Sequence, residues 1–183
     1  MADDLVLPFE VKPLGVRGRI VRLGPVVSDI LHRHAYPAPV SRLLGEAVAL
    51  TAMLGTAMKF DGKFILQTKT DGPVDMIVAD FLSPHGIRGY ARFDAGKVAA
   101  LATPTPAALL GKGHLAMTVD QGPDMDRYQG IVALDGNDLT AAAHSYFAQS
   151  EQIPTRVRLA AAPLLERGVS GESWRAAAIM VQH

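Results

Sequence analysis

Histidine is the residue type in this sequence best suited to hold a metal or to move protons, and its six copies are scattered. His32 and His34 lie two positions apart, whereas His85, His114 and His144 are isolated. A zinc site needs a third and usually a fourth ligand, and the sequence contains neither a cysteine nor a His-Glu-x-x-His motif. We therefore expect structural or surface roles for the histidines, and no metal or other cofactor bound by this chain.

Three further motifs resemble nucleotide-binding or nucleophilic sites but lack the required context. Residues 111–116 (Gly-Lys-Gly-His-Leu-Ala) fit the glycine-rich dinucleotide pattern, which must end a strand and open a helix, yet an alternating strand follows here. Residues 168–171 (Gly-Val-Ser-Gly) lack the spacing of a Gly-x-Ser-x-Gly elbow and fall in a predicted hairpin loop. His144 and Ser145 are neighbours on a predicted helix, so they point about 100° apart. We expect a loop at 111–116 and no enzyme activity.

Charged side chains offer one other kind of site. Five aspartates gather near predicted turns, at Asp120, Asp124, Asp126, Asp135 and Asp138. Aspartate favours turns because its carboxylate bonds to nearby backbone, and the beginning of a calcium loop at 135 and 137 is broken by Leu139. One alternative remains open at this level: a small-molecule-binding enzyme domain in which Arg92, Arg127 and Asp135 converge in a polar pocket.

Composition narrows the class of protein. The 183 residues are 49% hydrophobic and 20% charged, which is typical of one globular domain. Eighteen basic and eighteen acidic residues give zero net charge, which argues against a nonspecific nucleic-acid binder. No apolar run is long enough to span a membrane. Asp3 and Asp4 stand where a signal peptide would be basic, so we expect a cytoplasmic protein.

A long helix is predicted from Pro39 to Lys59, because its large apolar residues recur with helical period. Its opposite face is made of small residues, and no ionisable group occurs between Glu46 and Lys59. Such a helix is expected to be buried between layers or against a partner. The candidates for a client-binding or dimer surface on this helix are Gly45, Ala49, Ala52, Met53 and Thr56.

The remaining elements are mostly strands joined by turns. The predicted strands are 16–23, 63–70, 74–82, 86–93, 114–120, 128–134, 155–161 and 173–181. Helices are predicted at 25–35 and, with Asp138 as its N-cap, at 138–150, and a loop with one short helix at 98–110. Strands with few crossovers indicate an α+β fold. We expect largely antiparallel sheets and a buried long helix within one domain, residues 1–183.

Seven segments share their order and spacing with one known family. They are 34–40, 54–62, 71–73 (Asp-Gly-Pro), 89–92 (Gly-Tyr-Ala-Arg), 110–113 (Leu-Gly-Lys-Gly), 127–134 (Arg-Tyr-Gln-Gly-Ile-Val-Ala-Leu) and 146–155 (Tyr-Phe-Ala-Gln-Ser-Glu-Gln-Ile-Pro-Thr). Over about residues 15–182 the chain therefore resembles the redox-regulated holdase chaperones, the bacterial heat-shock proteins of about thirty-three kilodaltons.

This resemblance implies a β/β/α layered, substrate-binding N-terminal domain that holds unfolded client proteins without ATP and forms a homodimer. It also implies a linker and a C-terminal domain whose four cysteines bind zinc when reduced and form disulfides when oxidised. The sequence departs from the family here, because it has no cysteine. We therefore expect the chain to be the N-terminal domain alone, with zinc and disulfides belonging only to the full-length family.

Overall fold

The computed structural model describes residues 3–58, 61–84, 86–122, 125–165 and 172–183. Its strands are β1 (Leu5–Val11), β2 (Val16–Leu23), β3 (Lys63–Thr70), β4 (Val74–Leu82), β5 (Gly86–Phe93), β6 (Lys112–Asp120), β7 (Tyr128–Asp135), β8 (Thr155–Leu164) and β9 (Ser173–Gln182). Its α-helices are α1 (Pro25–His32), α2 (Ala38–Gly55), α3 (Ala95–Ala100), α4 (Pro106–Leu110) and α5 (Leu139–Tyr146). A 3-10 turn (Lys12–Leu14) and a π-helical turn (Phe147–Glu151) complete the chain.

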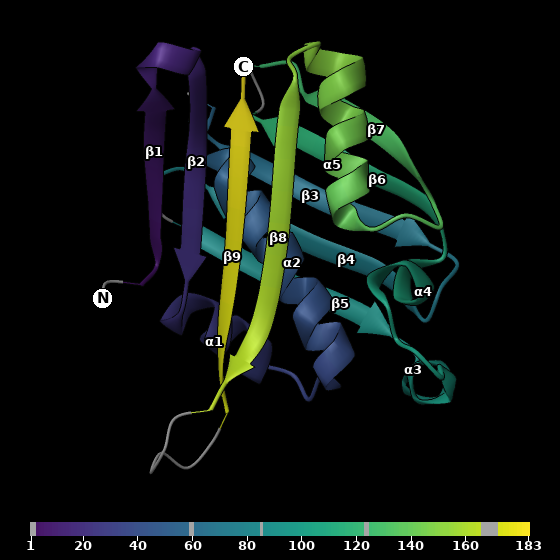
Figure 1. Ribbon diagram of the computed structural model, residues 1–183. Helices are drawn as coiled ribbons and strands as arrows, with labels where there is room; N and C mark the ends of the chain where they lie inside the picture. The colour runs from purple at the N-terminus through teal and green to yellow at the C-terminus, as the bar shows by residue number, and fades with distance from the viewer. Residues whose placement is uncertain (1–2, 59–60, 85, 123–124, 166–171) are drawn as a thin grey trace.

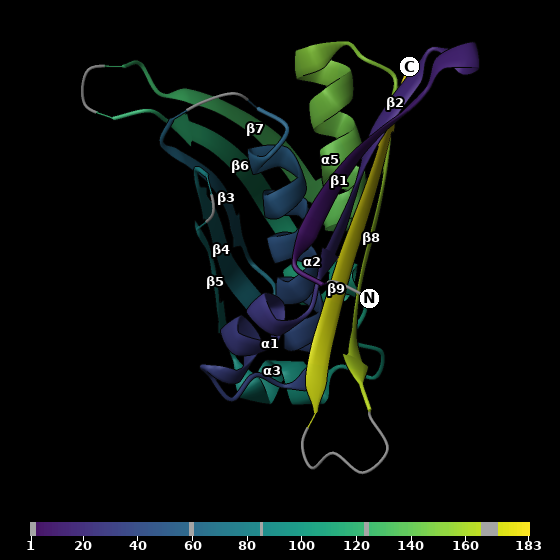
Figure 2. The same cartoon turned by 90° about the vertical axis from the view of Figure 1, so that its left-hand side faces the viewer.

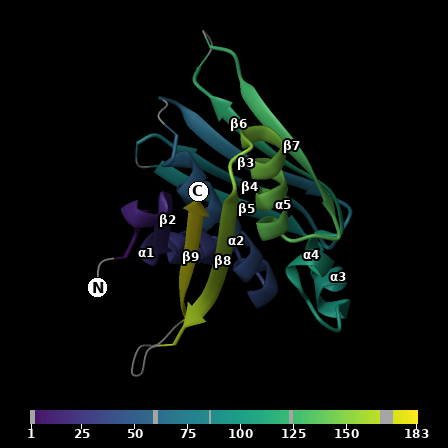
Figure 3. The same ribbon diagram turned by 45° about the horizontal axis from the view of Figure 1, so that its top comes forward.

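The strands form two antiparallel sheets (Figures 1 and 3). The four-stranded sheet has the order β1-β2-β9-β8, and the five-stranded sheet has the order β5-β4-β3-β6-β7. The hairpin of β3 and β4 closes through Asp71-Gly72-Pro73, as the turn residues predict. By contrast, β9 pairs with both β2 and β8, so the last strand of the fold lies between strands from the two ends of the chain.

Helix α2 lies between the two sheets and contacts both (Figure 2). The α+β class, the antiparallel sheets and the buried long helix are confirmed, but the layers run sheet, helix, sheet rather than in the expected β/β/α order. The small residues of α2 explain this arrangement. A Cβ added to Gly45 would lie 2.8 Å from the Cβ of Ala161 in β8, so only glycine allows the helix to approach the sheet this closely. Because a sheet covers each side of α2, the helix carries small residues on one face and large apolar residues on the other.

Strand β1 is the main element that the sequence did not predict. Pro8 interrupts its pattern, and a proline in a strand is accommodated mainly at a sheet edge, which is where β1 lies. Asp4 ties this strand to α1, because its carboxylate accepts hydrogen bonds from Gly24 N at 2.8 Å and Val26 N at 3.1 Å. The first turn of α1 is thereby satisfied by a residue from outside the helix.

Several predicted boundaries also change. The segment expected to be a loop at 111–116 mostly belongs to β6, which begins at Lys112. Region 98–110 contains parts of two short helices rather than one. Asp138 does cap α5, accepting a hydrogen bond from Ala141 N at 2.8 Å, but the helix becomes a π-helical turn after Tyr146. The predicted hairpin loop at 168–171 lies outside the described residues.

Candidate functional sites on the two sheet faces

The small-residue face of α2 is enclosed in this structure. Gly45, Ala49, Ala52 and Met53 are buried, and only Thr56 is partly exposed. A client or a second subunit could reach Gly45, Ala49 and Met53 only if the two sheets separated, whereas Ala52 borders the cleft described below. Their role as contact residues therefore stays a prediction, and the folded structure gives access to the C-terminal end of this face alone.

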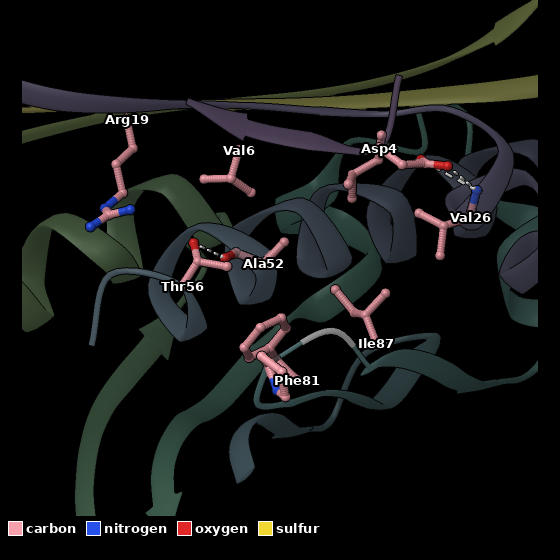
Figure 4. Close-up of a pocket in the computed structure, with 10 residues that line it drawn as sticks. Asp4, Val6, Arg19, Val26, Ala52, Thr56, Phe81 and Ile87 are labelled. Carbon is pink, nitrogen blue, oxygen red and sulfur yellow. Dashed lines mark hydrogen bonds between the residues drawn. The ribbon is translucent and has the colours of Figure 1, made fainter. Parts of the chain in front are cut away.

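That end opens into a cleft of about 520 Å³ between the edges of the two sheets (Figure 4). The cleft is lined mainly by apolar side chains from β1, β2, α1, α2, β4 and β5, namely Val6, Leu23, Val26, Ala52, Phe81 and Ile87. Two charged residues, Asp4 and Arg19, also border it. The Asp4 carboxylate is already bonded to the start of α1, so the cleft has no convergent set of free polar groups of the kind that orients a substrate.

The outer face of the four-stranded sheet is a larger candidate surface. Alternate residues of each strand, such as Val21, Val157 and Ala178, are buried toward α2, so the residues between them point away from the helix. In Figure 1 this sheet lies in front of α1 and α2, and in Figure 2 the labelled helices lie on its inner side. The sheet therefore presents one whole face outward.

In two adjacent rows this outer face is apolar across three strands and basic at the fourth. Arg22 of β2 and Arg175 of β9 lie on the same face farther along the strands, where both pair with Asp3. One row across the sheet consists of Leu7, Ile20, Ile179 and Arg158. The three apolar members are 52%, 37% and 38% exposed, respectively. The next row consists of Phe9, Gly18, Val181 and Arg156, and the Phe9 ring occupies the space that a side chain at Gly18 would need. Contiguous exposed apolar residues of this kind mark an interaction surface.

The outer face of the five-stranded sheet has a different character. It carries cross-strand ion pairs, Arg88 with Asp80, and Arg92 with Asp75 at 2.8 Å. Guanidinium contacts of this kind lower the pKa of the Asp75 carboxyl, chiefly through its hydrogen bond with Arg92. Exposed salt bridges contribute little stability, but they make part of this face polar. Leu82, Tyr90 and Ile131 of the same sheet are also exposed, so this face is mixed in character.

The same ion pairs remove the polar pocket that the alternative interpretation required. Arg92 pairs with Asp75, Arg127 pairs with Asp120 at 3.1 Å, and Asp135 pairs with Lys112 at 3.8 Å. Each of the three proposed pocket residues thus has its own partner on the surface of the five-stranded sheet. They do not converge, and nothing in their arrangement supports a small-molecule-binding enzyme site.

Histidines occupy separate positions in the fold. His144 Nε2 accepts a hydrogen bond from Val157 N at 2.8 Å, which joins α5 to β8. The His34 ring contacts Tyr36 in a tilted arrangement and Tyr90 edge-to-face, with ring centroids 5.3 Å apart in both contacts. Over the described residues, no three histidine or acidic side chains are arranged to hold a metal ion.

Glu46 is the one ionisable residue of α2 that lies within the layer between the sheets. It is only partly exposed, and burial raises its pKa to about 7, with a further rise from the nearby charge of Asp138. Arg42, one turn earlier, lowers the pKa by a smaller amount. In the sequence Glu46 marks only the boundary of the uncharged stretch, because helical period alone does not indicate that Asp138 at the start of α5 will lie near it.

The outer face of the four-stranded sheet was not predicted from the sequence either. Strand β2 held a signal for it, because both of its alternating sets contain apolar residues, Ile20 in one set and Val21 in the other. A strand with one solvated face normally alternates apolar and polar residues. Apolar residues in both sets indicate that both faces are used.

Comparison with known proteins gives a consistent result. The model of the family described as Hsp33 protein matches residues 4–183. A 33 kDa chaperonin of Caulobacter vibrioides is 50% identical over 184 residues, covering 98% of this chain and 60% of that protein. A 33 kDa chaperonin of Ectopseudomonas mendocina is 43% identical over 167 residues, covering 91% of this chain and 56% of that protein.

A solved structure extends the likeness to three dimensions. The crystal structure of the 33 kDa chaperonin from Thermotoga maritima superposes with a TM-score of 0.74 at 23% identity, covering 96% of this chain and 60% of that one. This match concerns the fold. The chain spans about 60% of the length of the first of these curated relatives. None of the helices within the described residues is long and apolar enough to cross a membrane.

Proposed function

The chain belongs to the Hsp33 protein family, and from that premise we propose that it is an ATP-independent holdase module, which binds unfolded proteins and prevents their aggregation. The observation that carries the proposal is the outer face of the four-stranded sheet. A holdase needs accessible apolar surface that tolerates many client sequences, and the exposed row of Leu7, Ile20 and Ile179 supplies it. No nucleotide or nucleophile is required for this activity.

We propose further that the protein acts in the cytoplasm as a homodimer, takes no part in nucleic-acid binding, and is not an enzyme. The zero net charge supports the absence of nucleic-acid binding. The zinc of the full-length family does not fit the residues of this chain, because the sequence has no cysteine and its described residues hold no cluster of metal ligands. Any zinc would have to be held by residues outside this sequence.

The test is light scattering from a heated client protein with a stoichiometric amount of this chain present. We expect less scattering without ATP, and to the same degree in reductant and in peroxide, because the chain has no thiol to oxidise. Undiminished scattering, with the chain itself still folded, would show that this domain alone is not the holdase.

Two matched variants test whether the activity belongs to the outer face of the four-stranded sheet. Ile179→Ser removes an apolar side chain from the outer face of the four-stranded sheet, whereas Ile131→Ser removes one that is 58% exposed on the five-stranded sheet. We expect Ile179→Ser to weaken suppression of aggregation and Ile131→Ser to leave it unchanged. Equal effects of the two variants would contradict the assignment of this face.

A further inference from the structure

We propose that the free edge of β8 binds an extended protein segment that carries acidic side chains at alternate positions. The segment would add to the four-stranded sheet as a fifth strand paired along Leu159 and Ala161. One acidic residue would lie opposite Arg158, and the next would extend past the blocked Val157 toward Arg156. This inference rests on the proposed function in one respect, since unfolded clients are the source of such segments. It differs from that function in naming the chemistry of the segment and the strand that receives it.

The edge of β8 has backbone groups that are free to pair. Val157 donates its N–H to His144 and not to β9, so the odd-numbered residues of β8 point their backbone groups away from the sheet. Leu159 and Ala161 follow in the same orientation, and among the described residues no backbone hydrogen bond to another element engages them. Unpaired edge groups are a template for an incoming strand.

Two features limit this edge to a short window. At its beginning, His144 of α5 already occupies the N–H of Val157. At its end, Pro163 has no N–H to donate. Between them lie the free donors and acceptors of Leu159 and Ala161, enough for a short added strand. An edge that is blocked at both ends and open between them suits a transient partner better than an extended one.

The charge of this edge selects the partner. Arg156 and Arg158 project from the outer face, and their guanidinium groups donate only to the carbonyl oxygens of Thr155 at 3.2 Å and Val157 at 3.3 Å. Within the described residues, no carboxylate lies within ion-pair distance of either. In contrast, Arg175 of the neighbouring strand β9 pairs with Asp3 at 3.1 Å.

An added strand would pair with the free backbone groups of β8 and would also supply partners for the arginine side chains. Residues directly opposite each other on neighbouring strands have their Cβ atoms about 5 Å apart, so an acidic residue opposite Arg158 would lie beside its guanidinium. The next acidic residue, beyond the paired window, would extend toward the long side chain of Arg156. The residues between them would point inward and pack beside Leu159, which is partly exposed. Backbone pairing supplies affinity, and the alternating side chains supply selectivity.

The experiment measures binding of a fluorescently labelled seven-residue peptide of alternating glutamate and valine to the whole chain by anisotropy. We expect saturable binding that weakens with salt, and no binding of the matching lysine–valine peptide. The double variant Arg156→Gln/Arg158→Gln should bind about tenfold more weakly, because it loses two cross-strand charge pairs. Arg33→Gln is the control, since Arg33 is exposed and forms no ion pair among the described residues.

Backbone pairing is tested separately with two N-methylated peptides, in which methyl groups occupy one or the other alternate set of amides. A segment added to β8 tolerates methylation of the set that points away from the edge and loses binding when the other set is methylated. Equal tolerance of both peptides, equal binding of the lysine peptide, or an unchanged affinity in the double arginine variant would each overturn the proposal.

The two proposals fail differently. If the chain suppresses client aggregation but does not bind the glutamate–valine peptide, the β8 inference is wrong and the holdase function stands. If the peptide binds as described but client scattering is undiminished, the β8 inference stands and the holdase function is wrong. If sedimentation shows that the double arginine variant loses self-association while peptide binding is absent, the occupant is a second copy of this chain, and the inference is overturned.

Discussion

Replacing Glu46 by glutamine should stabilise the protein at alkaline pH and have little effect in acid. The carboxyl group of Glu46 has its pKa raised from 4.5 to about 7 by burial and by the charge of Asp138. The folded state therefore holds a proton that the unfolded state releases. Between pH 4.5 and 7 the folded state binds more protons, so this group makes the free energy of unfolding fall as the pH rises.

The magnitude follows from the same displacement. A full change of this size corresponds to about 3 kcal/mol, and screening by solvent at a partly exposed carboxyl reduces it to roughly 1–2 kcal/mol. Glutamine imitates the protonated side chain without titrating. Glu46→Gln should accordingly be about 1–2 kcal/mol more stable than the parent at pH 8, and equal to it below pH 4.5.

Urea unfolding gives the measurement, because the single tryptophan, Trp174, is buried and its fluorescence reports on the folded state. Glu10→Gln, at an exposed position, is the matched control for loss of one carboxylate. Asp138→Asn keeps an oxygen that can cap α5 but removes the charge, so it should reduce the pH dependence of the parent. A Glu46→Gln variant that is destabilised at pH 8, or shifted equally at both pH values, would refute this reasoning.

Four other outcomes are expected. His144→Ala should cost about 1–3 kcal/mol in urea unfolding, because the N–H of Val157 loses its acceptor. Gly45→Ala should also destabilise the fold, by about 1–3 kcal/mol, because its Cβ would press on that of Ala161; an unchanged unfolding midpoint would contradict the close approach of α2. Equilibrium sedimentation should give a dimer whose interface buries more than about 1,000 Å², and a mass of 19.5 kDa at high concentration would contradict it. Metal analysis of the desalted protein should find no stoichiometric zinc.

The sequence predicted the elements whose signals are local. The hairpin of β3 and β4 follows from its turn residues, α2 follows from its period, and the cap of α5 follows from Asp138. Strand β1 was missed because Pro8 breaks its pattern, and proline is acceptable there only because the strand lies at a sheet edge. Edge position is a property of the assembled sheet and is not written in the local sequence.

For the candidate sites, too, local signals could be predicted from the sequence, whereas properties of the assembled fold could not. The small residues of α2 were correctly recognised as unusual, but periodicity does not say whether such a face meets a partner or the protein's own sheet, and here it meets Ala161 and Ala176. Arg92, Arg127 and Asp135 were expected to converge only in the enzyme alternative. Strand order separates Arg92 of β5 from Asp135 of β7, and Arg127 precedes the opposite end of β7. The apolar outer row likewise exists only because β9 aligns Ile179 with Ile20 across the sheet.

The central place of β9 also sets the order in which the protein can assemble during translation. The strands of the five-stranded sheet lie within residues 63–135, and all of them are synthesised before β9. Strands β1 and β2 emerge first, yet β2 must wait for β9, and Ser28 must wait for Trp174, whose N–H bonds to its hydroxyl across 146 residues. Contacts this distant in sequence close slowly. The nascent chain therefore carries an unpaired, apolar β2 edge until β9 has been made, so the proposed chaperone is itself exposed to aggregation until that strand is inserted.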